Sequence, residues 1–106
     1  MALHHVAPGE KVRLANLANV RAPGAIALVK NDGFETVQLI LEAGQHISEH
    51  AVPGHCTIHC LEGSVILQTE RLIELAEGDW LYLDRGEKHS VSATQPAVLL
   101  VTILFD

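Results

Sequence analysis

Hydrophobic and polar residues alternate along most of the chain in short runs, and no segment sustains the period of an amphipathic helix. Short runs of aliphatic and β-branched residues, separated by glycine, proline, asparagine and aspartate, are typical of β-strands. The expected strands cover residues 25–30, 34–42, 45–52, 56–61, 64–69, 71–75, 80–84, 89–93 and 97–105. About eight or nine short strands at this close spacing predict an all-β fold, an antiparallel sandwich or barrel.

Two turn sequences indicate how some of these strands connect. Asn31-Asp32-Gly33 predicts a tight turn between the first two strands, and Glu62-Gly63 is expected to close a second hairpin. Residues 1–21 are ambiguous and are expected to form an N-terminal arm or a short strand or helix. We therefore expect a single domain over residues 1–106, with its strands in residues 24–106.

The last strand, residues 97–105, is apolar on both faces, so both faces should be covered. Hydrophobic residues make up 48% of the chain and the mean hydropathy is +0.23, which is high for a lone domain. A second copy of the chain would cover the surplus apolar surface. We therefore expect a homodimer that packs sheet against sheet or exchanges edge strands.

Charge and cysteine spacing exclude several classes of partner and location. The formal net charge of −6, without a run of Lys or Arg, disfavours nucleic acid as a partner. No signal peptide is visible and no apolar run reaches the ~20 residues of a membrane helix, so we expect a cytoplasmic protein without a membrane partner. Cys56 and Cys60 on one extended strand would lie roughly 13 Å apart, too far for a disulfide, which fits a reducing compartment.

Two glycine-framed segments carry the candidate chemistry. In the first, Gly44 is followed by five residues and then His50, and the segment ends at Gly63. In the second, Gly78, Gly86 and His89 keep a fixed spacing. These segments resemble the two motifs of the cupin superfamily, and the chain looks like a small, single-domain, RmlC-like cupin with a degenerate first motif. The resemblance implies an antiparallel jelly-roll β-barrel in which His50 and His89 are metal ligands within one cavity.

The chain departs from the family motifs at positions that matter for a metal. Val52 stands at the second histidine position and Cys56 at the glutamate position, while Asp84 and Ala93 replace the proline and asparagine of the second motif. Two of the four usual ligands are therefore absent. A facial set of two histidines and one carboxylate is not available, which argues against a typical iron oxygenase.

Strand alternation suggests which residues could complete a metal site. His46, Ser48, His50 and Val52 should share one face, and Cys56 faces the cavity if it follows the family. The expected ligands of a divalent ion are His50, His89 and Cys56, a set that suits zinc or a softer ion, although iron, nickel and manganese stay open. Additional candidates are His46, His55 and His59, of which His59 requires a bulge in its strand.

Two functions of different classes remain open at this level. The first is a metal-dependent enzyme acting on a small organic molecule, with the ion polarising a carbonyl or enediol. The second is a metal-free module that binds or senses a small molecule in the same cavity, where the histidines only line the wall. Tyr82 and Trp80 are candidates for the mouth of that cavity, although core packing is the more common role of such residues.

Overall fold

The computed structural model describes residues 5–20 and 22–105, so the expected N-terminal arm, residues 1–21, can be followed only in part. Within the described residues there is no helix, and all strand pairs are antiparallel, which confirms the predicted all-β class. The nine strands are β1 (Gly24–Lys30), β2 (Phe34–Leu41), β3 (His46–His50), β4 (His55–Glu62), β5 (Ser64–Gln68), β6 (Leu72–Ala76), β7 (Trp80–Leu83), β8 (His89–Ala93) and β9 (Ala97–Leu104). Since the described residues contain no helix, they contain no helical membrane span.

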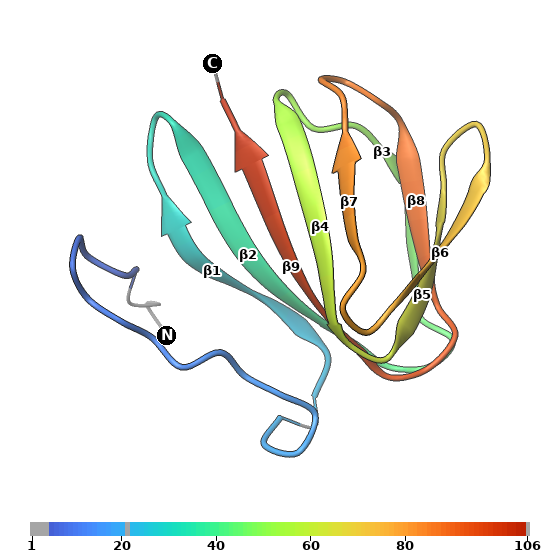
Figure 1. Ribbon diagram of the computed structural model, residues 1–106, viewed down its shortest axis with the longest axis horizontal. Helices are drawn as coiled ribbons and strands as arrows, with labels where there is room; N and C mark the ends of the chain where they lie inside the picture. Colours follow the sequence, from blue (N-terminus) through green and yellow to red (C-terminus); the bar gives the residue numbers. More distant parts are fainter. Residues whose placement is uncertain (1–4, 21, 106) are drawn as a thin grey trace.

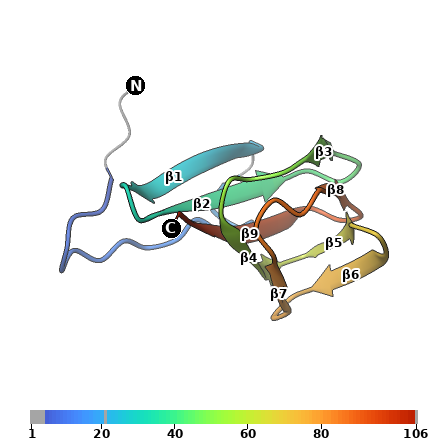
Figure 2. The same cartoon turned by 90° about the horizontal axis from the view of Figure 1, so that it is seen from above.

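The strands form two facing sheets, which are easiest to separate in the view from above (Figures 1 and 2). The larger sheet has the order β1-β2-β9-β4-β7, and the smaller one has the order β3-β8-β5-β6. Strands adjacent in sequence often lie in different sheets, which is the jelly-roll arrangement implied by the motifs. No hydrogen-bonded strand pair joins the two sheets in the described residues, so the expected barrel is an open sandwich.

The two predicted turns behave differently. Asn31 closes the β1–β2 hairpin as expected, because its Oδ1 accepts hydrogen bonds from the backbone N–H groups of Gly33 and Phe34 at 2.8 and 2.9 Å. The turn at Gly63 does not close a hairpin, because β4 and β5 belong to different sheets. Gly63 has a φ of 78° and lies against the backbone of Pro96, so the chain can cross between sheets only with glycine at this position.

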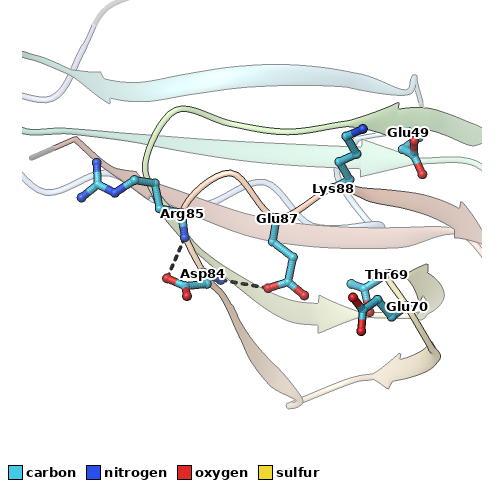
Figure 3. A pocket seen from close by; sticks show the side chains of 7 residues that line it. All are labelled: Glu49, Thr69, Glu70, Asp84, Arg85, Glu87 and Lys88. Atoms are coloured by element: carbon cyan, nitrogen blue, oxygen red, sulfur yellow. Dashed lines mark hydrogen bonds between the residues drawn. The ribbon is translucent and has the colours of Figure 1, made fainter.

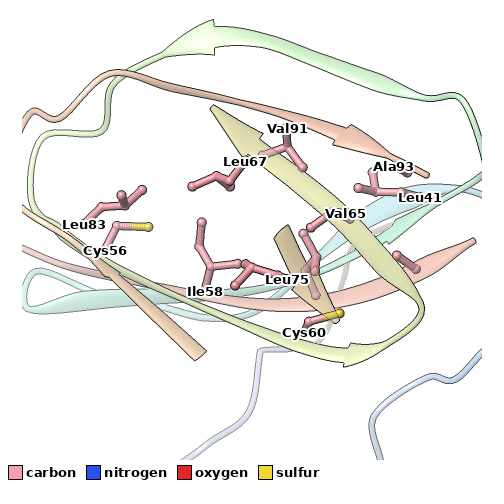
Figure 4. Close-up of a cluster of buried hydrophobic side chains, with 12 residues drawn as sticks. Leu41, Cys56, Ile58, Cys60, Val65, Leu67, Leu75, Leu83, Val91 and Ala93 are labelled. Atoms are coloured by element: carbon pink, nitrogen blue, oxygen red, sulfur yellow. The ribbon is translucent and has the colours of Figure 1, made fainter. Parts of the chain in front are cut away.

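The hydrophobic core lies between the two sheets, where alternate residues of each strand point inward (Figure 4). Its centre is formed by side chains with no exposed surface, among them Val65, Leu67 and Leu99. The expectation that β9 is covered on both faces holds only for its first half. Ala97, Val98 and Leu99 are fully buried, whereas Leu104 is 44% exposed on the outer face of the larger sheet.

The N-terminal segment is bonded to the outer face of the larger sheet, beside the start of β9. Gln38, buried on the outer face of β2, accepts a hydrogen bond from the Ala15 backbone N–H at 3.1 Å and donates one to the Ala15 carbonyl at 2.6 Å. Glu62 accepts a further bond from the Leu17 backbone N–H at 2.7 Å. Residues 5–20 are therefore an arm tied to the sheet by two polar side chains.

Candidate binding site between the two sheets

An apolar pocket of about 230 Å³ opens between the two sheets at the end where β3 and β8 pair. The larger sheet contributes aliphatic side chains from β2, β9 and β4, and the smaller sheet contributes aliphatic side chains and both motif histidines. The lining residues are Val37, Leu39, Ile47, His50, Val52, Ile58, His89, Val91, Leu99, Val101 and Ile103. His50 and His89 are therefore the only polar side chains among the described lining residues.

A β-bulge in β3 brings His50 onto this wall. Ile47 pairs with Val91, and the next pair in the register is His50 with His89, so β3 has one residue more than β8 between the two pairs. The extra residue lets Ile47 and His50 line the same pocket, although strict alternation would place them on opposite faces. The expectation that His46 and His50 share a face is wrong for this reason. His46 lies on the exposed side, where its Nδ1 is 2.9 Å from the Ser92 hydroxyl.

The two motif histidines face each other across the β3–β8 pair. Their ring centroids are 4.3 Å apart and their planes are tilted by 57°. His89 is 3% exposed, whereas His50 is exposed at the mouth of the pocket. The two rings therefore form one polar end of an otherwise apolar pocket, with one ring inside and the other at the entrance.

Backbone carbonyls fix the tautomer of both rings. His50 Nδ1 lies 2.9 Å from the carbonyl oxygen of Ser48, and His89 Nδ1 lies 3.1 Å from that of Glu87. A carbonyl oxygen can only accept, so in both rings Nδ1 carries the proton and donates it. The lone pair of each neutral ring is therefore on Nε2. Neither Nε2 atom has a hydrogen-bond partner among residues 5–20 and 22–105.

The buried ring stays neutral and reachable. Burial lowers the pKa of His89 below its ordinary value, the nearby His50 lowers it further, and the hydrogen bond to the Glu87 carbonyl opposes both effects. No buried side-chain nitrogen or oxygen in the described residues lacks a partner, so the unpaired Nε2 of His89 must remain accessible from the pocket. The site therefore offers a hydrogen-bond acceptor or metal ligand at the inner ring.

The two cysteines belong to the core and not to the pocket. Cys56 is 1% exposed and pairs in register with Leu83 and Ile103, among other core side chains (Figure 4). Burial raises the pKa of Cys56 to about 11, so its thiol stays protonated near neutral pH. Cys60, with no exposed surface, also has a raised pKa, mainly through burial. Cys56 therefore does not extend the histidine pair as the sequence suggested.

The remaining candidates lie outside the pocket. His59 pairs with Leu100 and Trp80 on the outer face of the larger sheet, because β4 has no bulge at that point. His55 lies at the start of β4, with its Nε2 3.7 Å from Asp84 Oδ1 and its ring edge-on to Tyr82 at 5.8 Å. Trp80 and Tyr82 are exposed on the same outer face, so neither lines the mouth of the pocket.

The donor set for a metal ion consists of the two histidines alone. No group of three or more His, Cys, Asp and Glu side chains in the described part of the chain is close enough to hold an ion. Two adjacent rings, each with Nδ1 bonded to a carbonyl and Nε2 left without a protein partner, remain chemically suited to a divalent ion that keeps open coordination positions. Such an ion would be held by fewer protein ligands than a closed structural site.

A larger polar hollow of about 590 Å³ lies at the surface beside the β7–β8 loop (Figure 3). The Asp84 backbone N–H donates to Glu87 Oε1 at 3.1 Å, and the Arg85 N–H donates to Asp84 Oδ1 at 2.8 Å. These bonds shape the loop that presents the Glu87 carbonyl to His89. This backbone role could not be predicted from the sequence, because it depends on the conformation of the loop and not on a residue type.

No family model matches the chain, and no curated protein matches it. Solved structures do match. A cupin superfamily protein from Desulfitobacterium hafniense aligns over 100% of both chains with a TM-score of 0.82 and 20% identity. A conserved protein of unknown function from Streptococcus pyogenes aligns over 100% of this chain and 98% of its own, with a TM-score of 0.80 and 19% identity.

A third solved structure that matches the chain has a named fold. This RmlC-like cupin from Methanocaldococcus jannaschii has a double-stranded β-helix fold and covers 91% of each chain, with a TM-score of 0.78 and 16% identity. Likeness at such identities shows the architecture and leaves substrate and activity to the site itself. The fold implied by the two glycine-framed motifs is thereby confirmed, and the chain has the jelly-roll fold of the small RmlC-like cupins.

Proposed function

We propose that the pocket between the sheets binds a small, largely apolar organic molecule whose polar group contacts His50 and His89. The observation that carries this proposal is the shared tautomer of the two neighbouring rings. Both place a proton on Nδ1 and leave Nε2 without a partner, within an otherwise aliphatic wall. A ligand with a hydroxyl or amino group can donate a hydrogen bond to Nε2 while its apolar part contacts the aliphatic side chains.

The size of the pocket limits the ligand. A volume of about 230 Å³ is below the ~300–1,000 Å³ that accommodates drug-sized ligands. The ligand is therefore a small molecule of a single ring or a short branched chain. Among the described lining residues none is an acid, a serine or a cysteine, so the proposal is binding and includes no catalysed step.

A divalent metal ion held by the two Nε2 atoms is the second candidate. The observation that favours it is again the anchored pair of rings, since a carbonyl that accepts from Nδ1 orients the opposite nitrogen toward a metal. Such an ion would act as a Lewis acid toward an oxygen of the bound molecule. Because only two side chains would hold it, we expect weak binding that requires micromolar or higher free metal.

A matched pair of probes tests the first candidate. Phenol and anisole have similar apolar surfaces, but only phenol can donate a hydrogen bond. We expect NMR titration to show phenol binding roughly two- to twelvefold more tightly, because a net hydrogen bond contributes ~0.5–1.5 kcal/mol. Chemical-shift changes should centre on Ile58 and Val91, which line the pocket. Equal affinity of the two probes, or shifts elsewhere, would contradict the proposal.

Variants separate the two candidates. His89→Leu should remove the preference for phenol, because leucine has no hydrogen-bond acceptor, whereas His46→Leu, on the exposed side of β3, should keep it. Titration with Zn²⁺ or Ni²⁺ alone, followed by calorimetry, tests the metal candidate. Binding of one ion per chain that is lost in both His50→Gln and His89→Gln would support a metal site. Binding that survives either substitution would place the ion elsewhere.

A further inference from the structure

The loop between β7 and β8 holds the atom that decides the tautomer of the buried ring. His89 Nδ1 lies 3.1 Å from the carbonyl oxygen of Glu87, and this histidine is 3% exposed. A neutral imidazole carries one proton on either of its two nitrogens, and the hydrogen bond at one nitrogen sets which of them is protonated. The position of the Glu87 carbonyl therefore determines whether His89 Nε2 accepts a hydrogen bond or donates one.

Residues 84–87 form a turn that ends at this carbonyl (Figure 3). The Glu87 backbone N–H donates to the Asp84 carbonyl at 3.1 Å, and Gly86, the third residue of the turn, has a φ of 71°. The Glu87 side chain closes the same turn in the opposite direction, since its Oε1 accepts from the Asp84 backbone N–H at 3.1 Å. Glu87 is therefore bonded to Asp84 twice, once through its backbone and once through its carboxylate.

The Asp84 carboxylate fixes the start of the turn. Its Oδ1 accepts from the Arg85 backbone N–H at 2.8 Å and from the Tyr82 hydroxyl at 3.3 Å, and His55 Nε2 lies 3.7 Å from it. The Arg85 N–H, and after it the Tyr82 hydroxyl, hold the pKa of Asp84 below its ordinary value, so this carboxylate is charged at neutral pH. The start of the turn is thereby connected to β4 and β7 of the larger sheet, while its end leads into β8 of the smaller sheet.

This polar closure is a property of the chain and not of the motif that it resembles. Asp84 stands where that motif has proline. Proline has no backbone N–H, so it could not donate to the Glu87 carboxylate. Asp84 and Glu87 are both exposed and fill no part of the core. Their hydrogen bonds are directed at the turn that carries the Glu87 carbonyl.

We propose that Glu87 and Asp84 are positioning residues that set the hydrogen-bond specificity of the pocket. Their side chains hold the turn, the turn holds the Glu87 carbonyl at His89 Nδ1, and His89 Nε2 is left as an acceptor. When the turn is loosened, the ring gains access to the tautomer with its proton on Nε2, and the pocket loses its preference for ligands that donate a hydrogen bond. This inference rests on the proposed function for the choice of ligand, but the tautomer can be measured without any ligand.

Nitrogen-15 NMR of the ligand-free, chelator-treated protein at neutral pH tests the proposal. Glu87→Met removes the acceptor of the Asp84 N–H and keeps the length of the side chain. We expect the ratio of Nδ1–H to Nε2–H tautomers at His89 to fall at least about twofold, as for the loss of one net hydrogen bond. His50 is the internal control in the same spectrum, because its Nδ1 is bonded to the Ser48 carbonyl and its tautomer should not change.

Two further variants distinguish a positioning role from a general loss of structure. Glu87→Gln keeps the Oε1 acceptor and should retain the wild-type tautomer of His89. Glu70→Met, an exposed position that lines the same surface hollow, is the matched control and should also retain it. Titration with phenol and anisole should follow the tautomer, so the preference for phenol falls at least about twofold in Glu87→Met and is kept in Glu87→Gln.

The ligand-free spectrum keeps the two proposals separate. An unchanged His89 tautomer in Glu87→Met would overturn the positioning role, as would an equal change in Glu87→Gln or Glu70→Met. A changed tautomer with an unchanged preference for phenol would overturn the connection between the turn and the class of ligand. If wild type binds neither probe, the proposed function fails, whereas a changed tautomer in Glu87→Met still supports the positioning role.

Discussion

The imidazoles of His50 and His89 lie 4.3 Å apart, and each is held by the backbone carbonyl two residues before it. The bonding partners are Ser48 for the first ring and Glu87 for the second. Because both anchors are backbone atoms, the orientation of the rings depends on the bulge in β3 and the loop before β8, and not on neighbouring side chains. Each ring therefore leaves the lone pair of Nε2 without a protein partner among the described residues, where a proton donor or a metal ion can use it.

We predict that both rings carry their proton on Nδ1. Nitrogen-15 NMR of the protein at neutral pH, after treatment with a chelator, should show unprotonated Nε2 atoms for His50 and His89. His46 is the internal comparison, since its Nδ1 contacts the Ser92 hydroxyl, which can donate or accept and therefore fixes no tautomer. A protonated Nε2 in either pocket ring would contradict the carbonyl anchoring.

The strands and the histidine pair could be predicted from the sequence, but the bulge could not. The glycine spacing placed His50 and His89 in one cavity correctly. His50 ends β3 and His89 begins the antiparallel strand β8, so the two residues pair at the same edge of the smaller sheet. Ser48 and Glu49, where the register shifts, are ordinary strand residues with no glycine to mark a bulge. A reading based on strict alternation therefore placed His46 beside His50 and missed Ile47 as a pocket residue.

The sequence of β7 also does not determine which of its side chains point into the core. Trp80 and Tyr82 alternate with Leu81 and Leu83, so both faces of the strand are apolar. Only the pairing of Leu83 with buried Cys56 decides that the leucines point inward. The same pairing moves the aromatic residues from the expected mouth of the cavity to the outer face of the larger sheet.

Cys56 gives a prediction about alkaline pH. Burial raises its pKa from 9.0 to about 11, so the folded state retains the thiol proton that the unfolded chain loses first. The stabilisation from this group is complete below pH 9 and is lost as pH rises toward 11, by at most ~1.4 kcal/mol per unit. We expect the stability difference between wild type and Cys56→Ala to fall in that window in urea titrations. A constant difference from pH 8 to 11 would contradict the assignment.

Gly63 and Gly78 form a matched pair for the turn argument. Both have positive φ, at 78° and 93°, but a Cβ at Gly63 would collide with the Pro96 carbonyl, whereas one at Gly78 would meet nothing. We expect Gly78→Ala to cost ~1–2 kcal/mol from the backbone conformation alone. Gly63→Ala should cost ~1–3 kcal/mol more, as for an overpacked site. Equal losses in chemical denaturation would show that the crossing between sheets tolerates a side chain.

The arm provides a prediction about local opening. Gln38→Met keeps the length of the side chain but removes the amide that bonds the Ala15 N–H and carbonyl. The informative reporter is Leu17, whose N–H is bonded to Glu62 and not to Gln38. If the hydrogen bonds of Gln38 and Glu62 hold the arm as one cooperative unit, hydrogen exchange at Leu17 should accelerate at least about tenfold in this variant. Such a change corresponds to a loss of ~1.4 kcal/mol in the free energy of local opening. Gln68→Met, an exposed position on β5, is the control and should leave Leu17 unchanged. Protection of Leu17 that survives Gln38→Met would show that Glu62 holds its part of the arm independently.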